Sequence, residues 1–235
     1  MSAGRDRWLR IAAGLTGPRD NAPPLSAGLC SRCVETLSVA GTGITVMASA
    51  GVHVSMCASD PTVRRLAELE FTLGNGPAVD AYEGGVPVLE VDLVNAPPTR
   101  WAAFAGPAVD SGIRAVFAFP LRLGAARLGA LILYQPRPGA MADDTMADAL
   151  VAAEVITRAV LTMQSGMPEE GLMAELDDGT ALHAEVHQAS GMVSVQLDVG
   201  VGDALARLRA RAFALNRPIA DVAADVVARR MRFDD

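Results

Sequence analysis

The sequence predicts an α+β fold in which helices cover an antiparallel sheet, followed by a small domain of three short helices. Two pairs of short apolar segments, 43–49 with 52–58 and 113–120 with 126–135, have the lengths and turn residues of β-hairpins. Segments whose apolar residues recur at helical spacing precede, separate and follow these hairpins. Residues 165–180 are rich in Gly and Pro, as expected of a linker between two domains.

Three helices are expected in the first third of the chain, at 5–15, at about 23–40 and at 61–71. The first is amphipathic and ends before Gly17-Pro18, a helix-stopping pair. The third begins after Asp60, because an aspartate accepts hydrogen bonds from the first free N–H groups and the following proline suits the first helical turn.

The middle of the chain is expected to contain less regular structure. Residues 73–88 are dense in Gly and Pro and are predicted as a loop, with a short strand at about 86–91. A helix is expected at 101–111, before the second hairpin. The segment 143–164 has one apolar stripe and predicts a long helix that covers the sheet and offers a seam to a second copy, so a homodimer is expected.

Composition and charge limit the classes of partner. Of the 235 residues 51% are hydrophobic, and no apolar run approaches the roughly 18 residues of a membrane span. No signal peptide is recognisable, so a cytoplasmic protein is expected. The net charge of −7 excludes a broadly basic nucleic-acid coat, but residues 1–182 carry 13 arginines against 20 acidic residues whereas 183–235 carry 7 of each. A polyanion would therefore be steered to the C-terminal part.

Cysteines and histidines offer little catalytic chemistry. Three cysteines cannot form a disulfide framework, and Cys30, Cys33 and Cys57 are predicted to be buried thiols. The alternative is a thiol or redox enzyme that uses the Cys30–Cys33 pair. His183 and His187 lie one helical turn apart without a third metal ligand. No Ser-His-Asp set or nucleotide fingerprint is present, so we expect no metal, no cofactor and no enzymatic activity.

Three stretches in the first 164 residues carry a resemblance to a known family: LGNGPAVDAYEGGVPVLEVDL, then RWAAFA, then AVFAFPLRLGAARLGALILY. Through them, residues 25–164 resemble a GAF domain, the small-molecule sensor fold, of the variety that precedes RNA-binding ANTAR domains. The resemblance implies a pocket between the sheet and segments 73–92 and 100–112, and it leaves residues 1–24 as an N-terminal extension. Because these segments are mostly small and apolar, either the ligand is small and apolar or the pocket is filled and the domain serves dimerisation.

Residues 183–230, within a domain expected at 181–235, resemble an ANTAR domain. The matching positions are Gln188, Ala189, Gly191, Ala204, Leu208, Arg209, Ala212, Asn216, Arg217, Asp221, Val222 and Ala223. The resemblance implies a ligand-responsive transcription antiterminator, a dimer that holds tandem hairpins of nascent mRNA so that the terminator stem cannot form.

The cations of this domain are the candidates for contact with RNA, because planar guanidinium groups bind phosphates and stack on splayed bases. Ser190 and Gln196 stand where the family commonly has Lys and Arg. The candidate RNA-binding residues are Gln188, Ser190, Gln196, Arg207, Arg209, Arg211, Asn216 and Arg217. As alternatives, Arg207 and Arg211 simply share an exposed helix face, and Arg229, Arg230 and Arg232 complement a helix dipole. The alternative function is a signalling or scaffold protein whose C-terminal helices bind a protein partner.

Overall fold

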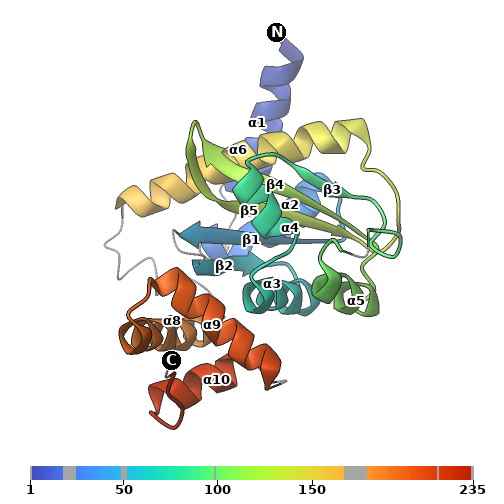
Figure 1. Cartoon of the computed structure of the whole chain (residues 1–235). Helices are drawn as coiled ribbons and strands as arrows, with labels where there is room; N and C mark the ends of the chain where they lie inside the picture. Colours follow the sequence, from blue (N-terminus) through green and yellow to red (C-terminus); the bar gives the residue numbers. More distant parts are fainter. Residues whose placement is uncertain are drawn as a thin grey trace.

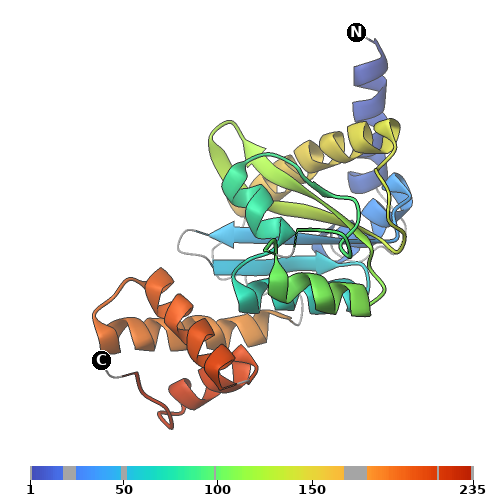
Figure 2. The ribbon, with the colours of Figure 1, turned by 45° about the vertical axis from the view of Figure 1, so that its right-hand side comes forward.

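The computed structural model describes residues 2–17, 25–48, 52–97, 99–166, 179–215 and 217–233. We call residues 2–166 the N-terminal domain and residues 179–233 the C-terminal domain. Figures 1 and 2 both place the C-terminal domain beside strand β2 and helix α3 of the N-terminal domain. The expected linker at 165–180 lies largely outside the described residues. No described helix has both the length and the apolar composition needed to cross a membrane.

Within the described residues, five strands form one antiparallel sheet in the order β2-β1-β5-β4-β3. The strands are β1 Gly41–Ala48, β2 Val52–Ala58, β3 Val88–Glu90, β4 Ala115–Leu123 and β5 Ala126–Gln135. Both expected hairpins and the short strand are therefore confirmed, while the turn between β1 and β2 lies outside the described residues. A side chain at Gly129 would collide with the Thr45 carbonyl of the paired strand, which explains a glycine inside β5.

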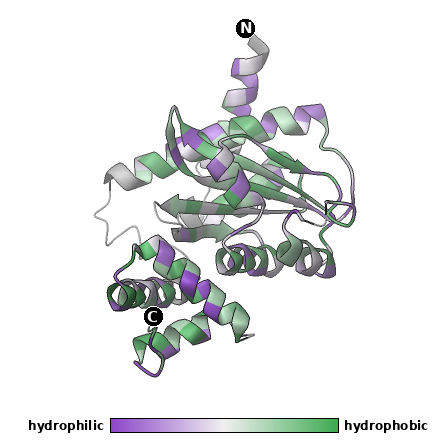
Figure 3. Cartoon of the chain, viewed as in Figure 1, coloured by the Kyte–Doolittle hydropathy of each residue, from purple (hydrophilic) through white to green (hydrophobic). Residues whose placement is uncertain are grey.

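Helices cover both faces of this sheet, as Figure 1 shows. The helices α1 Ser2–Thr16, α2 Leu25–Leu37 and α6 Asp143–Gly166 pack on one face, and α3 Pro61–Leu73, α4 Pro77–Gly84 and α5 Ala102–Asp110 pack on the other. Alternation along the strands divides the core between the two faces: Phe117 and Leu131 face α1, α2 and α6, whereas Val116 and Ile132 face α3, α4 and α5. The strands are mostly hydrophobic in Figure 3 because both of their faces are buried.

Helix α1, which belongs to the expected N-terminal extension, packs on the rest of the N-terminal domain. Arg7 forms ion pairs with Asp144 and Asp148 of α6, at 2.7 and 2.9 Å, and Arg10 pairs with Asp148 at 2.7 Å. Ile11 of α1 is fully buried in the core formed with α2 and α6. Helix α1 is therefore part of the layer that covers the sheet.

Helix α4 corrects the sequence prediction of a loop at 73–88. Gly74 ends α3 in the left-handed conformation with φ 66°, Gly76 caps the next helix, and Pro77 occupies its first turn. The buried Glu70 side chain accepts a hydrogen bond from Ala78 N at 2.9 Å, which satisfies a free N–H of the first turn. The Gly and Pro residues therefore delimit a short helix whose capping carboxyl lies eight residues earlier in the sequence.

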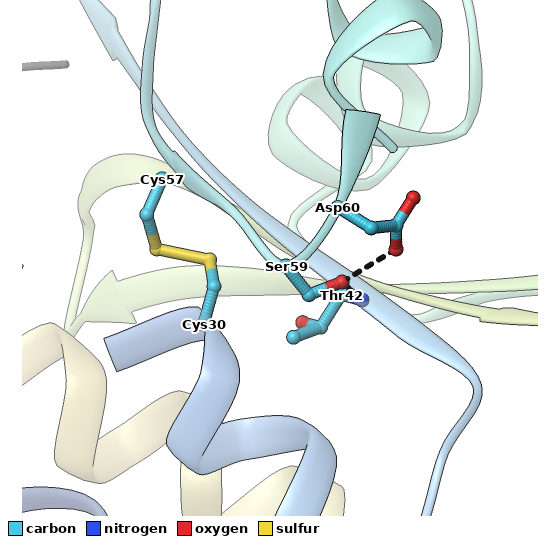
Figure 4. The surroundings of a disulfide bond; sticks show 5 residues. All are labelled: Cys30, Thr42, Cys57, Ser59 and Asp60. Atoms are coloured by element: carbon cyan, nitrogen blue, oxygen red, sulfur yellow. Dashed lines mark hydrogen bonds between the residues drawn. A yellow bond between two sulfur atoms is a disulfide. The ribbon is translucent and has the colours of Figure 1, made fainter. Parts of the chain in front are cut away.

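A disulfide bond corrects the expectation of three free thiols. Cys30 of α2 is bonded to Cys57 of β2, with their Cα atoms 5.9 Å apart (Figure 4). The two residues are 27 positions apart, and the packing of α2 on β2 brings them together. The expectation of a buried thiol is confirmed for Cys33, and burial raises its pKa to about 12, so this thiol is a poor nucleophile.

In residues 179–215 and 217–233, three helices form the C-terminal domain, as the sequence predicts. They are α8 Gly179–Leu197, α9 Val201–Ala214 and α10 Ile219–Val227. Their shared core contains the fully buried Val186, Val193, Leu208 and Val226. The core also contains Phe71, a residue of α3 in the N-terminal domain, so the two domains share hydrophobic packing.

Candidate functional site

The C-terminal domain has a groove along α8, which we call the α8 groove. It has a volume of about 680 Å³ and is lined by Gln188, Gly191, Met192, Val195, Gln196, Arg229 and Arg232. Two of the expected RNA-binding residues, Gln188 and Gln196, thus lie beside two cations that follow α10. The Gln196 side-chain carbonyl accepts a hydrogen bond from Phe233 N at 2.9 Å, which holds the C-terminal segment against α8.

The α9 arginines at positions 207 and 211 extend this cationic surface. Both side chains are exposed, and the Arg211 guanidinium lies over the Phe233 ring at 5.4 Å from its centroid. Phe233 therefore connects Arg211 on α9 with Gln196 in the α8 groove. In the part of the chain that the structure describes, neither Arg207 nor Arg211 forms an ion pair.

Arg209 has a different position from its neighbours on α9. Its Nε donates a hydrogen bond to the main-chain oxygen of Phe71 at 2.9 Å, and its guanidinium lies 5.5 Å from the centroid of the Phe71 ring. Burial lowers the pKa of Arg209 to about 10, so the side chain stays cationic at neutral pH. In this conformation Arg209 is directed at the N-terminal domain.

The Phe71 ring completes the contact between the domains. Phe71 is 2% exposed, and its ring meets the His187 ring edge-on with their centroids 5.9 Å apart. Burial and the neighbouring Arg209 lower the pKa of His187. Gly74 ends α3 beside Arg209: a Cβ at Gly74 would lie 2.7 Å from Nη1 of Arg209, so the absence of a side chain permits this close approach.

The other expected RNA-binding residues differ in whether they are exposed to a partner. Arg217 is exposed and donates from Nη2 to Asp225 Oδ2 at 2.8 Å, while Arg230 donates to the other oxygen of Asp225 at 2.8 Å. These two hydrogen bonds, that of Arg230 first, lower the pKa of Asp225. Ser190 is completely buried and donates its hydroxyl to the Val186 carbonyl at 2.8 Å, so it is not presented to a partner here. Asn216 lies outside the described residues.

Three residues of these surfaces were not among the expected site residues. Arg229 and Arg232 have a simple sequence interpretation as cations after a helix end, and only the packing of the C-terminal segment places them next to α8. Phe71 is one of several apolar residues on α3. Its sequence position carries no signal that its ring enters the other domain, because that depends on how the domains dock.

The face expected to hold a small-molecule pocket is filled with side chains next to the sheet, and a smaller pocket of about 370 Å³ lies at α5, lined in part by Leu93 and Val109. Ala81, Phe104 and Ala108 are fully buried between the sheet and helices α4 and α5. Trp101, directly before α5, is 5% exposed and donates from its indole N–H to Asp80 Oδ2 at 2.9 Å. Small side chains allow close approach of the helices to the sheet, and bulky ones occupy the space that remains.

Two buried polar groups lie in this packed region. Burial raises the pKa of Glu70 to about 8, with a smaller contribution from Asp80, while the hydrogen bond from Ala78 opposes the shift. Within the described residues, neither Oε2 of Glu70 nor the Tyr134 hydroxyl has a hydrogen-bond partner. Burial raises the pKa of Tyr134 well above its ordinary value, so its hydroxyl stays protonated.

Comparison with solved structures shows which known fold the chain is similar to. The chain is similar to the GAF domain of a Coxiella burnetii phosphoenolpyruvate-protein phosphotransferase, at TM-score 0.53 and 15% identity over 68% of this chain and 96% of that one. It is also similar to the GAF domain of an Acinetobacter phosphoenolpyruvate-protein phosphotransferase, at TM-score 0.52 and 10% identity over 72% and 99%. No family model matches the sequence, and no curated protein matches it. The antiparallel sheet with helices on both faces is a GAF-like fold, and identities this low establish the fold alone.

Proposed function

We propose that this protein is a non-enzymatic, RNA-binding transcription antiterminator of the cytoplasm. In this proposal the C-terminal domain holds tandem hairpins of a nascent transcript, and the GAF-like domain responds to a small molecule or mediates dimerisation. The observation that carries the proposal is the surface formed by the α8 groove and the outer side of α9. In the described part of the chain, Arg207, Arg211, Arg229 and Arg232 are exposed there without an acidic partner.

The distribution of ion pairs supports this surface. Asp225 pairs with both Arg217 and Arg230, so these two arginines, unlike those of the α8 groove, have an acidic partner among the described residues. Val195, which is 84% exposed, provides an apolar contact between the groove's polar side chains. Cations that surround an apolar patch suit RNA loops, whose phosphates and unstacked bases are both accessible.

Binding to a synthetic dual-hairpin RNA, measured by fluorescence anisotropy over a range of salt concentrations, tests the proposal. Arg229→Ala and Arg232→Ala should each weaken binding and lower the slope of affinity against salt by about 1, because each removes one phosphate contact. Arg158→Ala on α6 is the matched control, since this exposed arginine lies in the N-terminal domain. Hairpin binding that is equally strong in wild type and in the Arg229/Arg232 double variant would exclude the assigned surface.

Exposed apolar residues favour a second candidate, a signalling or scaffold protein that binds a protein partner. Phe213 at the end of α9 is 81% exposed, and Leu215 next to it is 43% exposed. Large exposed apolar side chains are typical of protein interfaces. Capture of a protein that is lost in Phe213→Ser, together with no RNA cross-linking in cells, would favour this candidate over the first.

A homodimer is part of the proposal. Leu150 on α6 is 48% exposed and Leu9 on the adjacent α1 is 51% exposed, so the outer side of this helical layer offers apolar contacts to a second copy. Sedimentation at tens of micromolar protein should show a dimer. A monomer at that concentration would contradict this part of the proposal.

A further inference from the structure

A groove separates the end of α3 from α9 and the turn that precedes α10, and we call it the interdomain groove. Its volume is about 720 Å³, and both domains contribute to its lining. Leu73 and Gly74 come from the N-terminal domain, whereas Arg209, Ala210 and Phe213 come from α9. Pockets of this size between domains are common sites for small ligands.

Two guanidinium groups line the interdomain groove, and each has nitrogens without a protein acceptor. Arg209 uses Nε for the Phe71 carbonyl, and within the described residues neither the buried Nη2 nor Nη1 donates a hydrogen bond. Arg217 uses Nη2 for Asp225 and for the Asp221 carbonyl, which leaves its Nε and Nη1 without an acceptor in the same part of the chain. Asp225 pairs with Arg217 but is not among the residues that line the groove, and no other acidic residue is among the described lining residues. The groove is therefore suited to an anion.

The remaining lining is mostly apolar. Leu73 lies on one side, while Ala206 and Ala210 on α9 leave space on the other. The Phe213 ring, at the edge of the groove, is 81% exposed and offers a face on which a flat group can stack. Two cations within an apolar lining match a ligand that has a charged end and a planar body.

We infer that the interdomain groove is a binding site for a small organic anion, in which a carboxylate or phosphate contacts Arg209 and Arg217 and a planar apolar body lies against Phe213. This site is distinct from the face between the sheet and helices α4 and α5, because none of its lining residues comes from either helix. The inference goes beyond the proposed RNA function and does not depend on it.

Because of the position of Arg209, binding of such a ligand would affect the contact between the two domains. The same guanidinium holds the Phe71 carbonyl and lines the groove, so a bound anion would contact both the C-terminal domain and, through Leu73 and Gly74, the N-terminal domain. A ligand that binds only this arrangement stabilises it by RT ln(1 + [L]/Kd), where [L] is the free ligand concentration. Binding should therefore strengthen the contact between the two domains.

Fluorescence titration of the full chain with naphthoate tests the inference, because naphthoate combines a flat apolar body with a carboxylate. Adenosine monophosphate is the phosphate-bearing probe in a parallel calorimetric titration. Saturable binding of either probe at one site per chain is expected, and it identifies which anionic group is preferred. Naphthalenemethanol and inorganic phosphate, which each lack one half of the chemistry, should bind about tenfold more weakly or worse, as expected for loss of one charge-assisted hydrogen bond or of the stacked body.

Variants locate the site without disturbing the fold. Ala210→Phe fills the groove from an exposed position and should abolish probe binding, whereas Ala214→Phe, at an exposed position of α9 outside the lining, should leave it unchanged. Arg217→Gln should weaken binding by about tenfold. Arg209→Gln also removes a contact between the domains, so a loss of probe binding in that variant would not locate the site by itself. Ala210→Phe and Phe213→Ser, which keep Arg209, test whether the probe binds in the groove. Failure of both anions to bind at millimolar concentration, or binding that survives Ala210→Phe, would overturn the inference. Neither result bears on hairpin binding at the α8 groove.

Discussion

Replacing Phe71 by alanine should uncouple the two domains more than it damages either one. The side chain belongs to α3, yet it is 2% exposed and packs in the core of the C-terminal domain. The substitution removes the ring and keeps the main-chain carbonyl, so the hydrogen bond from Arg209 Nε can persist. The effect therefore reports on the packing of the ring.

The expected cost follows from what the ring contacts. Removal of a buried phenylalanine side chain generally lowers the free energy of unfolding by about 3–5 kcal/mol. The contact with the Arg209 guanidinium at 5.5 Å and the edge-on contact with His187 at 5.9 Å are part of that loss. Each contributes on the order of 0.5–1.5 kcal/mol in partly buried surroundings.

Native-state hydrogen exchange across a urea series can assign this loss to a domain. In Phe71→Ala the amides of α8, α9 and α10 should lose more protection than those of the sheet. Phe104→Ala is the matched control, because Phe104 is fully buried against the sheet within the N-terminal domain. That variant should show the opposite order, with the larger loss in the sheet.

A double-mutant cycle isolates the contact with the cation. Arg209→Met keeps the aliphatic stem and removes the guanidinium, and the cycle with Phe71→Ala should give a coupling energy of about 0.5–2 kcal/mol. A coupling energy below about 0.3 kcal/mol, within the range of additivity for independent sites, would refute the argument that ring and guanidinium together hold the domains. Equal loss of protection in both domains would refute it as well.

Three further perturbations test other parts of the structure. Cys57→Ser, or a reductant, should lower the free energy of unfolding by about 3–4 kcal/mol, because the bond closes a loop between residues 27 apart, whereas Cys33→Ala should respond to the same reductant as wild type does. Glu70→Gln should stabilise the protein increasingly as pH rises from about 4.5 towards 8. The folded pKa of this carboxyl is raised to about 8, so the wild type loses stability across that window, and denaturant midpoints at pH 5 and pH 8 measure the difference. His187→Leu should remove a loss of stability on acidification. The folded pKa of His187 is lowered, so the unfolded chain binds the extra proton as pH falls below about 6.5, and equal pH dependence in both proteins would contradict this.

Local patterns predicted most of the secondary structure, because each element depends on residues near in the chain. Alternating and apolar runs predicted all four hairpin strands, and Asp60 with Pro61 marked the start of α3, where the Asp60 carboxylate accepts from Thr62 N and Val63 N. Helix α4 was missed, because the carboxyl that caps it belongs to Glu70 at the end of another helix. Glycine and proline density alone does not distinguish a loop from a short helix with defined ends.

The candidate site was predictable only in part. The charge count located the cations in the C-terminal domain, and helical spacing indicated that Arg207 and Arg211 share a face. Neither the charge count nor the helical spacing indicated that Arg209, two residues from each, contacts Phe71 in the other domain. Nor did it place Arg232 beside Gln196, since that contact requires the C-terminal segment to turn back onto α8.

By itself, the order of the residues determined which segments form helices and strands, how charge is divided between the halves of the chain, and which side chains are apolar enough to be buried. Periodicity and most caps involve residues close together in the chain, so they can be recognised in the sequence. Tertiary structure alone decided the Cys30–Cys57 bond, the entry of Phe71 into the C-terminal core and the two different roles of neighbouring arginines on α9. Each of these joins residues far apart in sequence, and their proximity follows from how whole surfaces pack to bury apolar area.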